Sequence, residues 1–126
     1  MATYIIKKNN VFTMNRGDTA TMNFNVNLDL PEGAIIDKLY LGITEPNQYF
    51  EDALIKKTFE INKDITITTE NNIWSFSIQI NPEDTVDIIP GTYYYEVKAS
   101  GIIDQNEERI DFATTIVQKT KFIIVE

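Results

Sequence analysis

Strict alternation of apolar and polar residues over residues 20–28 is the feature that most constrains this chain. The segment reads Ala-Thr-Met-Asn-Phe-Asn-Val-Asn-Leu, with apolar residues at even positions and polar residues at odd positions. Successive side chains on a β-strand point to opposite faces, so the pattern predicts a strand with one buried face and one wet face. An α-helix would scatter the same apolar side chains around its whole circumference.

The same period recurs along the chain and predicts the fold class. Trp74–Ile80 again carries apolar residues at even positions, and Tyr93–Ala99 is enriched in aromatic residues. Turn-forming residues such as Pro90-Gly91 separate the runs, as in β-sandwiches. We therefore expect an all-β chain, folded as a single Ig-like antiparallel β-sandwich, with further strands at 4–7, 11–14, 39–43, 53–59, 65–68, 112–117 and 121–125.

One segment departs from the strand pattern. Asn81 is followed by Pro82, Glu83 and Asp84, which places a capping residue, a proline and two acids in the order typical of a helix start. The sequence predicts one short helical turn within residues 82–87.

The length of 126 residues suits one hydrophobic core, so residues 1–126 are expected to form one domain. Asn9-Asn10 separates the apolar segment Thr3–Lys8 from the rest. Residues 1–9 are therefore either an arm that adds a strand to a neighbouring protein or the domain's own first strand.

Charge and composition exclude several classes of partner. The chain has 11 basic and 19 acidic residues, a net charge of −8, and no cluster of Lys or Arg larger than a pair. The electrostatic field of a protein with this negative net charge repels phosphate backbones and anionic lipid, so neither nucleic acid nor a membrane is an expected partner. The N-terminus lacks a signal-peptide pattern, which favours synthesis in the cytoplasm.

The chain has few of the residue types that commonly carry out catalysis. The chain contains neither His nor Cys, which removes the usual general base, thiol nucleophile and zinc ligands. Two carboxylate groups remain, at Glu83, Asp84 and Asp87 and at Asp104, Glu107 and Glu108, both beside predicted turns. The second group lacks the glycine of a calcium loop. We expect no catalytic residue, no metal and no cofactor; a small carboxylate hydrolase is the enzymatic alternative.

Two motifs each have a structural and a functional interpretation. Arg16-Gly17-Asp18 spells an integrin-binding tripeptide, but a tight turn with Gly17 at positive φ explains it as well. The ring cluster of Trp74, Phe76, Tyr93 and Tyr95 is either a sugar-binding platform or core packing, and alternation favours the core. The alternative of a carbohydrate-binding module would rely on aromatic residues that point outward, Tyr94 and Tyr49.

The stretch from Asn72 to Val97 carries a resemblance. A helical turn is followed by Pro90-Gly91-Thr92-Tyr93 at the entry to a strand, which resembles the corner before strand F of Ig-like domains. There a tyrosine hydroxyl bonds back to upstream backbone, the role that Tyr93, with Pro90 and Gly91, would fill here.

The order of motifs from Arg16-Gly17-Asp18-Thr19 to Tyr94-Tyr95-Glu96-Val97 resembles the Ig-like N-terminal domain of phage baseplate upper proteins and related small phage virion proteins. That resemblance implies a non-enzymatic virion structural protein of tail or baseplate type, present as a homo-oligomer and docked to other virion proteins. A capsid decoration or head-fibre protein is the alternative within the same class. The expected contact residues are Tyr4, Ile5, Ile6, Tyr94 and Tyr49.

Overall fold

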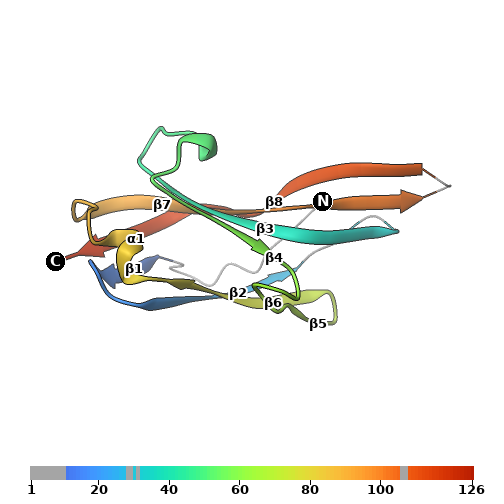
Figure 1. The fold of residues 1–126 in the computed structure, drawn as a ribbon, viewed down its shortest axis with the longest axis horizontal. Coiled ribbons are helices and arrows are strands. Elements are labelled where there is room, and N and C mark those ends of the chain that lie inside the picture. The colour runs from blue at the N-terminus through green and yellow to red at the C-terminus, as the bar shows by residue number, and fades with distance from the viewer. Residues whose placement is uncertain (1–10, 28–29, 31, 106–107) are drawn as a thin grey trace.

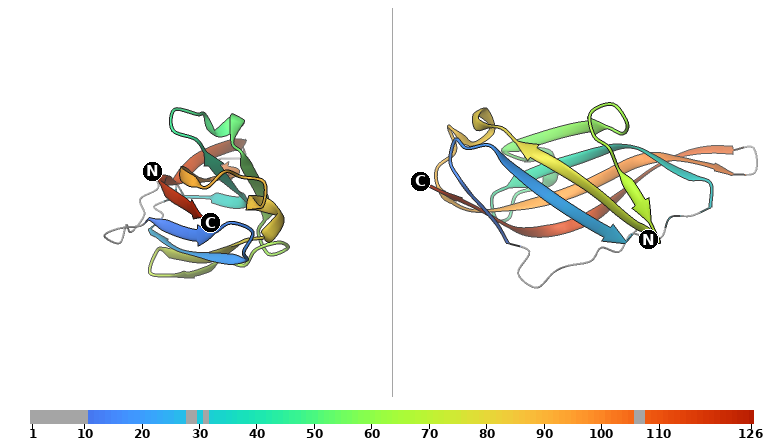
Figure 2. Two further views of the ribbon diagram at one scale, coloured as in Figure 1. Left: turned by 90° about the vertical axis from the view of Figure 1, so that its left-hand side faces the viewer. Right: turned by 90° about the horizontal axis from the view of Figure 1, so that it is seen from below.

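The computed structural model describes residues 11–27, 30, 32–105 and 108–126, and these form two packed β-sheets (Figures 1 and 2). The larger sheet contains, in spatial order, β1 (Phe12–Asn15), β8 (Glu108–Val125), β7 (Gly91–Gln105), β3 (Ala34–Thr44) and β4 (Ile55–Glu60). The smaller sheet contains β2 (Ala20–Asn27), β6 (Ile73–Ile80) and β5 (Thr68–Glu70). A 3-10 turn, η1 (Phe50–Asp52), follows β3, and one helical turn, α1 (Pro82–Thr85), follows β6.

The predicted fold class is confirmed, with one correction. The chain is an all-β sandwich whose strand order matches an Ig-like domain, and the helical turn α1 lies within residues 82–87 as expected. The strand pairs are antiparallel except for β1 and β8, which pair in parallel with Phe12 beside Phe122. β1, the first described strand, and β8, the last, lie side by side at one edge of the larger sheet.

The core lies between the sheets and is built by the alternating residues. In β2 the even-numbered side chains Met22, Phe24 and Val26 are buried, while the odd-numbered side chains are exposed. The rings of Phe24 and Phe76 stack at 5.1 Å between centroids. Tyr93 and Tyr95 are also buried and Trp74 packs against the core, which confirms the core interpretation of the ring cluster.

The helical turn α1 contacts the Arg16-Gly17-Asp18 motif near the start of the described chain. Its first-turn carboxylate, Asp84, accepts a hydrogen bond from the backbone N–H of Asn81, the residue before the turn. The buried Thr85 hydroxyl accepts the backbone N–H of Gly17 at 2.8 Å. Gly17 has φ of +80°, so the Arg16-Gly17-Asp18 motif is the tight turn expected, held against α1.

Strand lengths differ most from prediction in the last third of the chain. The expected strands at 112–117 and 121–125 are one strand of 18 residues, β8, and β7 continues to Gln105. Residue pairing between β7 and β8 shifts twice, at Tyr95/Val97 and at Val97/Lys98, which marks a bulged stretch. Bulges interrupt the alternation of side chains, so the sequence pattern there breaks into two pieces.

Candidate docking surface

The outer edge of β8 is open over most of its length in the described part of the chain. β1 pairs with β8 only at Phe122–Val125. Among the residues that the structure describes, no strand pairs with residues 108–121 on the side away from β7. An unpaired strand edge presents free N–H and C=O groups and is a template for another strand.

The end of this edge also extends past the smaller sheet. The β7–β8 hairpin projects beyond β2, β5 and β6 along the long axis of the molecule (Figure 1). Ile103 pairs with Ile110 there, on the face that further along the sheet forms the core. Ile110 is 51% exposed and Phe112 is half-buried, so the projecting hairpin leaves apolar surface uncovered.

A loop on the opposite face of the larger sheet presents Tyr49. The ring of the next residue, Phe50, lies against Gly42, where an added Cβ would come within 2.5 Å of the ring. The Lys98 ammonium lies 4.8 Å from the centroid of the Phe50 ring. Tyr49 itself is 76% exposed, whereas Tyr94 is half-buried in β7, so of these two expected contact residues Tyr49 presents more surface.

The corner before β7 has the connectivity of a tyrosine corner. The Tyr93 hydroxyl donates to the backbone carbonyl of Ile89, four residues upstream. Pro90, Gly91 and Thr92 separate the two residues, and Gly91 begins β7. The remaining expected contact residues, Tyr4, Ile5 and Ile6, lie outside the described residues, as does the segment Thr3–Lys8.

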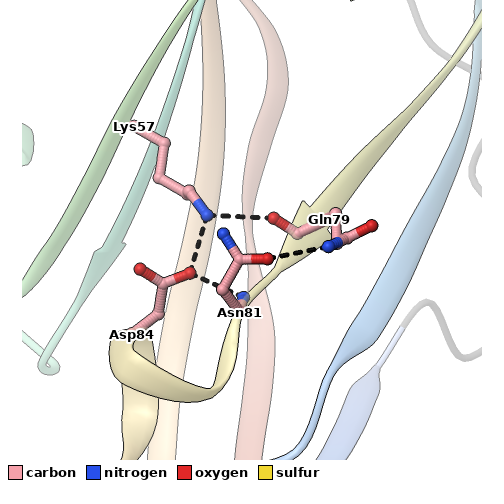
Figure 3. Close-up of polar contacts among 4 residues, drawn as sticks. All are labelled: Lys57, Gln79, Asn81 and Asp84. Carbon is pink, nitrogen blue, oxygen red and sulfur yellow. Dashed lines mark hydrogen bonds and ion pairs between the residues drawn. The ribbon is translucent and has the colours of Figure 1, made fainter.

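A polar cluster ties the two sheets together on the β4 side (Figure 3). Lys57, from β4, donates to the Asp84 carboxylate at 2.6 Å and to the backbone carbonyl of Gln79 at 3.0 Å. The same Asp84 oxygen accepts the Asn81 backbone N–H at 2.7 Å. The side chains of Lys57 and Asp84 are only 16% and 18% exposed, so this cluster is structural rather than a free pair of reactive groups.

Removing the carboxylate from this cluster should destabilise the fold. We expect Asp84→Ala to lower the free energy of unfolding by about 2 kcal/mol, because the largely buried Lys57 loses its ion pair and Asn81 loses a capping acceptor. Asp87→Ala, an exposed acid of the same loop, should change it by about 0.5 kcal/mol or less. Urea unfolding measures both; equal effects would contradict a role for the cluster.

The carboxylates considered for catalysis or calcium do not form a site in the described part of the chain. Asp84 is occupied by Lys57 and Asn81, and no group of three or more His, Cys, Asp or Glu side chains converges there. An open groove of about 560 Å³ on the smaller sheet is lined mainly by amide and hydroxyl side chains, and two of these pairs, Asn23 with Ser77 and Asn25 with Ser75, are hydrogen-bonded to each other. Within the described residues, no helix is both long and apolar enough to span a bilayer.

Comparisons with known proteins return structures but no sequence family. No protein-family model matches the sequence, and no curated protein matches it. One similar solved structure is AggA, the major subunit of aggregative adherence fimbriae type I of Escherichia coli, with 16% identity and a TM-score of 0.44, covering 99% of this chain and 92% of that one. A second, from aggregative adherence fimbriae of enteroaggregative Escherichia coli, has 13% identity and a TM-score of 0.46, covering 99% and 98%. At these values the likeness says nothing about what this chain binds.

The comparisons correct the family resemblance inferred from the sequence. Both similar structures come from bacterial fimbriae and neither is a phage baseplate protein. The tail or baseplate role, the capsid decoration or head-fibre alternative, the virion partners and the virion localisation are therefore withdrawn. The carbohydrate-module alternative is withdrawn with them, and its ring platform is part of the core.

Proposed function

We propose that this protein is a non-enzymatic structural subunit that assembles with other protein subunits by strand addition at the open edge of β8. The observation that carries the proposal is the stretch of β8 over residues 108–121, which no other described strand than β7 pairs with. Strand addition uses main-chain hydrogen bonds for affinity and side-chain contacts for specificity.

The edge is not uniform along its length. The two shifts of pairing with β7 fall between Thr115 and Thr120, and a bulged edge twists away from an incoming strand. Pairing with β7 is regular from Arg109 to Thr115. Docking is therefore concentrated on the regular part, which belongs to the projecting hairpin.

Apolar surface distinguishes this edge from the outer edge of β2. The inward side chains of β2, Met22, Phe24 and Val26, are already buried, so an added strand there would gain mainly backbone hydrogen bonds. A strand added to β8 would in addition cover Ile110, which is half exposed. Because removing apolar surface from water is favourable, strand addition at β8 is favoured over strand addition at β2.

Hydrogen exchange of the full chain at low and high protein concentration tests the proposal. Backbone amides of residues 109–115 that point away from β7 should exchange quickly in the monomer and become at least about tenfold more protected on assembly. Residues 73–75 of β6, which pair with β2 on one side and β5 on the other, are the internal control. Assembly without added protection of β8, or a monomer at all concentrations, would refute the proposed docking.

A further inference from the structure

The outer edge of the β7–β8 hairpin is complementary to itself. Arg109 and Asp111 are two residues apart on β8, so both side chains lie on the same face of the sheet. Both are exposed, and within the described residues neither has an ion-pair partner. Between them Ile110 lies on the other face, 51% exposed.

We infer that β8 docks antiparallel to β8 of a second copy, with Ile110 opposite Ile110 of that copy across a two-fold axis perpendicular to the sheet. This inference rests on the proposed docking at the β8 edge and names its partner. In this register Arg109 lies directly opposite Asp111 of the second copy, and the symmetry makes the contact twice. Opposite charges in directly opposed positions stabilise an antiparallel pair.

Neighbouring registers are less favourable. Moving the pairing by one residue on each strand centres it on Asp111, which would then face Asp111 of the second copy. Like charges in directly opposed positions destabilise a strand pair. The charge pattern thus selects the register centred on Ile110.

The inner face supports the same register. A two-fold axis perpendicular to the sheet keeps the inner faces of both copies on one side, so Ile110 meets Ile110 and Phe112 lies on the diagonal to it, within reach of an aromatic side chain. Docking therefore covers the apolar surface that the smaller sheet leaves open. In this register the paired segment is Glu108–Phe112 of each copy, because β8 begins at Glu108. The two larger sheets would join there into one continuous sheet.

A charge exchange tests the pairing. Arg109→Asp and Asp111→Arg, each in the full chain, should weaken self-association about tenfold or more, because each turns two attractive contacts into two repulsive ones. The double variant, with both changes, should restore association to within about threefold of the wild type. Sedimentation velocity over a concentration series measures the dissociation constants, and thermal unfolding checks that each variant is folded.

Glu70→Arg is the matched control. It makes the same change of charge as Asp111→Arg on an exposed residue of β5, in the other sheet, and should leave association unchanged. Failure of the double variant to recover, or equal weakening by Glu70→Arg, would overturn the self-pairing. If residues 109–115 still gain hydrogen-exchange protection in that case, strand addition at β8 stands with a different partner strand; if the wild type shows neither association nor protection, both ideas fall.

Discussion

Replacing Phe122 with alanine should lower the free energy of unfolding by about 3–5 kcal/mol, one of the two largest effects expected in this protein. Phe122 is fully buried in β8 and its ring lies 5.3 Å from that of Phe12 and 6.5 Å from that of Tyr95, measured between centroids. Truncation would leave a cavity where three strands of the larger sheet meet. Because β1 has only four residues, loss of the Phe12 contact should also weaken its pairing with β8.

Urea unfolding of Phe122→Ala and Phe122→Leu distinguishes the free-energy cost of the cavity from a general sensitivity of this position to substitution. Leucine keeps most of the buried volume and should cost about 1.5 kcal/mol or less. The surface variant Lys121→Ala, at the exposed neighbouring residue, should change stability by about 0.5 kcal/mol at most. An alanine variant no less stable than the leucine variant would show that Phe122 is not a centre of the core.

Gly101→Val should be similarly damaging, with a loss of about 3 kcal/mol or more, for a different reason. Gly101 of β7 faces Ile36 of β3, next to the point where the pairing of these strands is shifted. A Cβ at Gly101 would lie 1.9 Å from the backbone oxygen of Ile35 and 2.8 Å from its carbonyl carbon. Backbone atoms cannot rotate away as a side chain can, so β3 and β7 would have to separate locally.

Gly91→Ala is the matched comparison for this prediction. At Gly91 the nearest atoms to an added Cβ are 3.8 Å away or more, which is ordinary van der Waals contact. Thermal unfolding should show a shift of a few degrees at most for Gly91→Ala, against a loss of well over 10 °C for Gly101→Val. Similar melting temperatures would mean that the strands adjust more easily than their spacing indicates.

Local patterns predicted the parts of the fold that depend on neighbouring residues. The alternation over 20–28 correctly predicted β2, and the segment Asn81-Pro82-Glu83-Asp84 correctly predicted α1. Burial of one strand face and capping of a helical turn both depend on which residues occupy neighbouring positions, so a local pattern is enough to predict them. The expected strand at 65–68 was less accurate. Ile65 forms only an isolated bridge with Ile61, and β5 begins at Thr68.

The open edge of β8 could not be predicted from the sequence, because an edge is defined by which strands are absent beside it. Residues 112–117 and 121–125 have strand composition, but nothing in them shows that they are one strand or that β1 covers only the end of it. The exposure of Ile110 has the same origin, since it depends on where the smaller sheet stops. Arg109 and Asp111 were visible only as charges near an expected turn at 104–106, and the structure places them on a projecting strand.

The parallel pairing of β1 with β8 has a mechanical consequence. If the two ends of the described chain were pulled apart, β1 would be drawn toward its first residue and β8 toward its last, which are opposite directions along the same ladder. Tension would then act along the strands and across all the bonds between Phe12–Asn15 and Phe122–Val125 together, rather than opening them one at a time. The ion pair of Arg16 with Glu126, at 2.7 Å, lies at the end of the same ladder and would share the force. A fold in which the first described strand pairs in parallel with the last resists stretching through this short ladder.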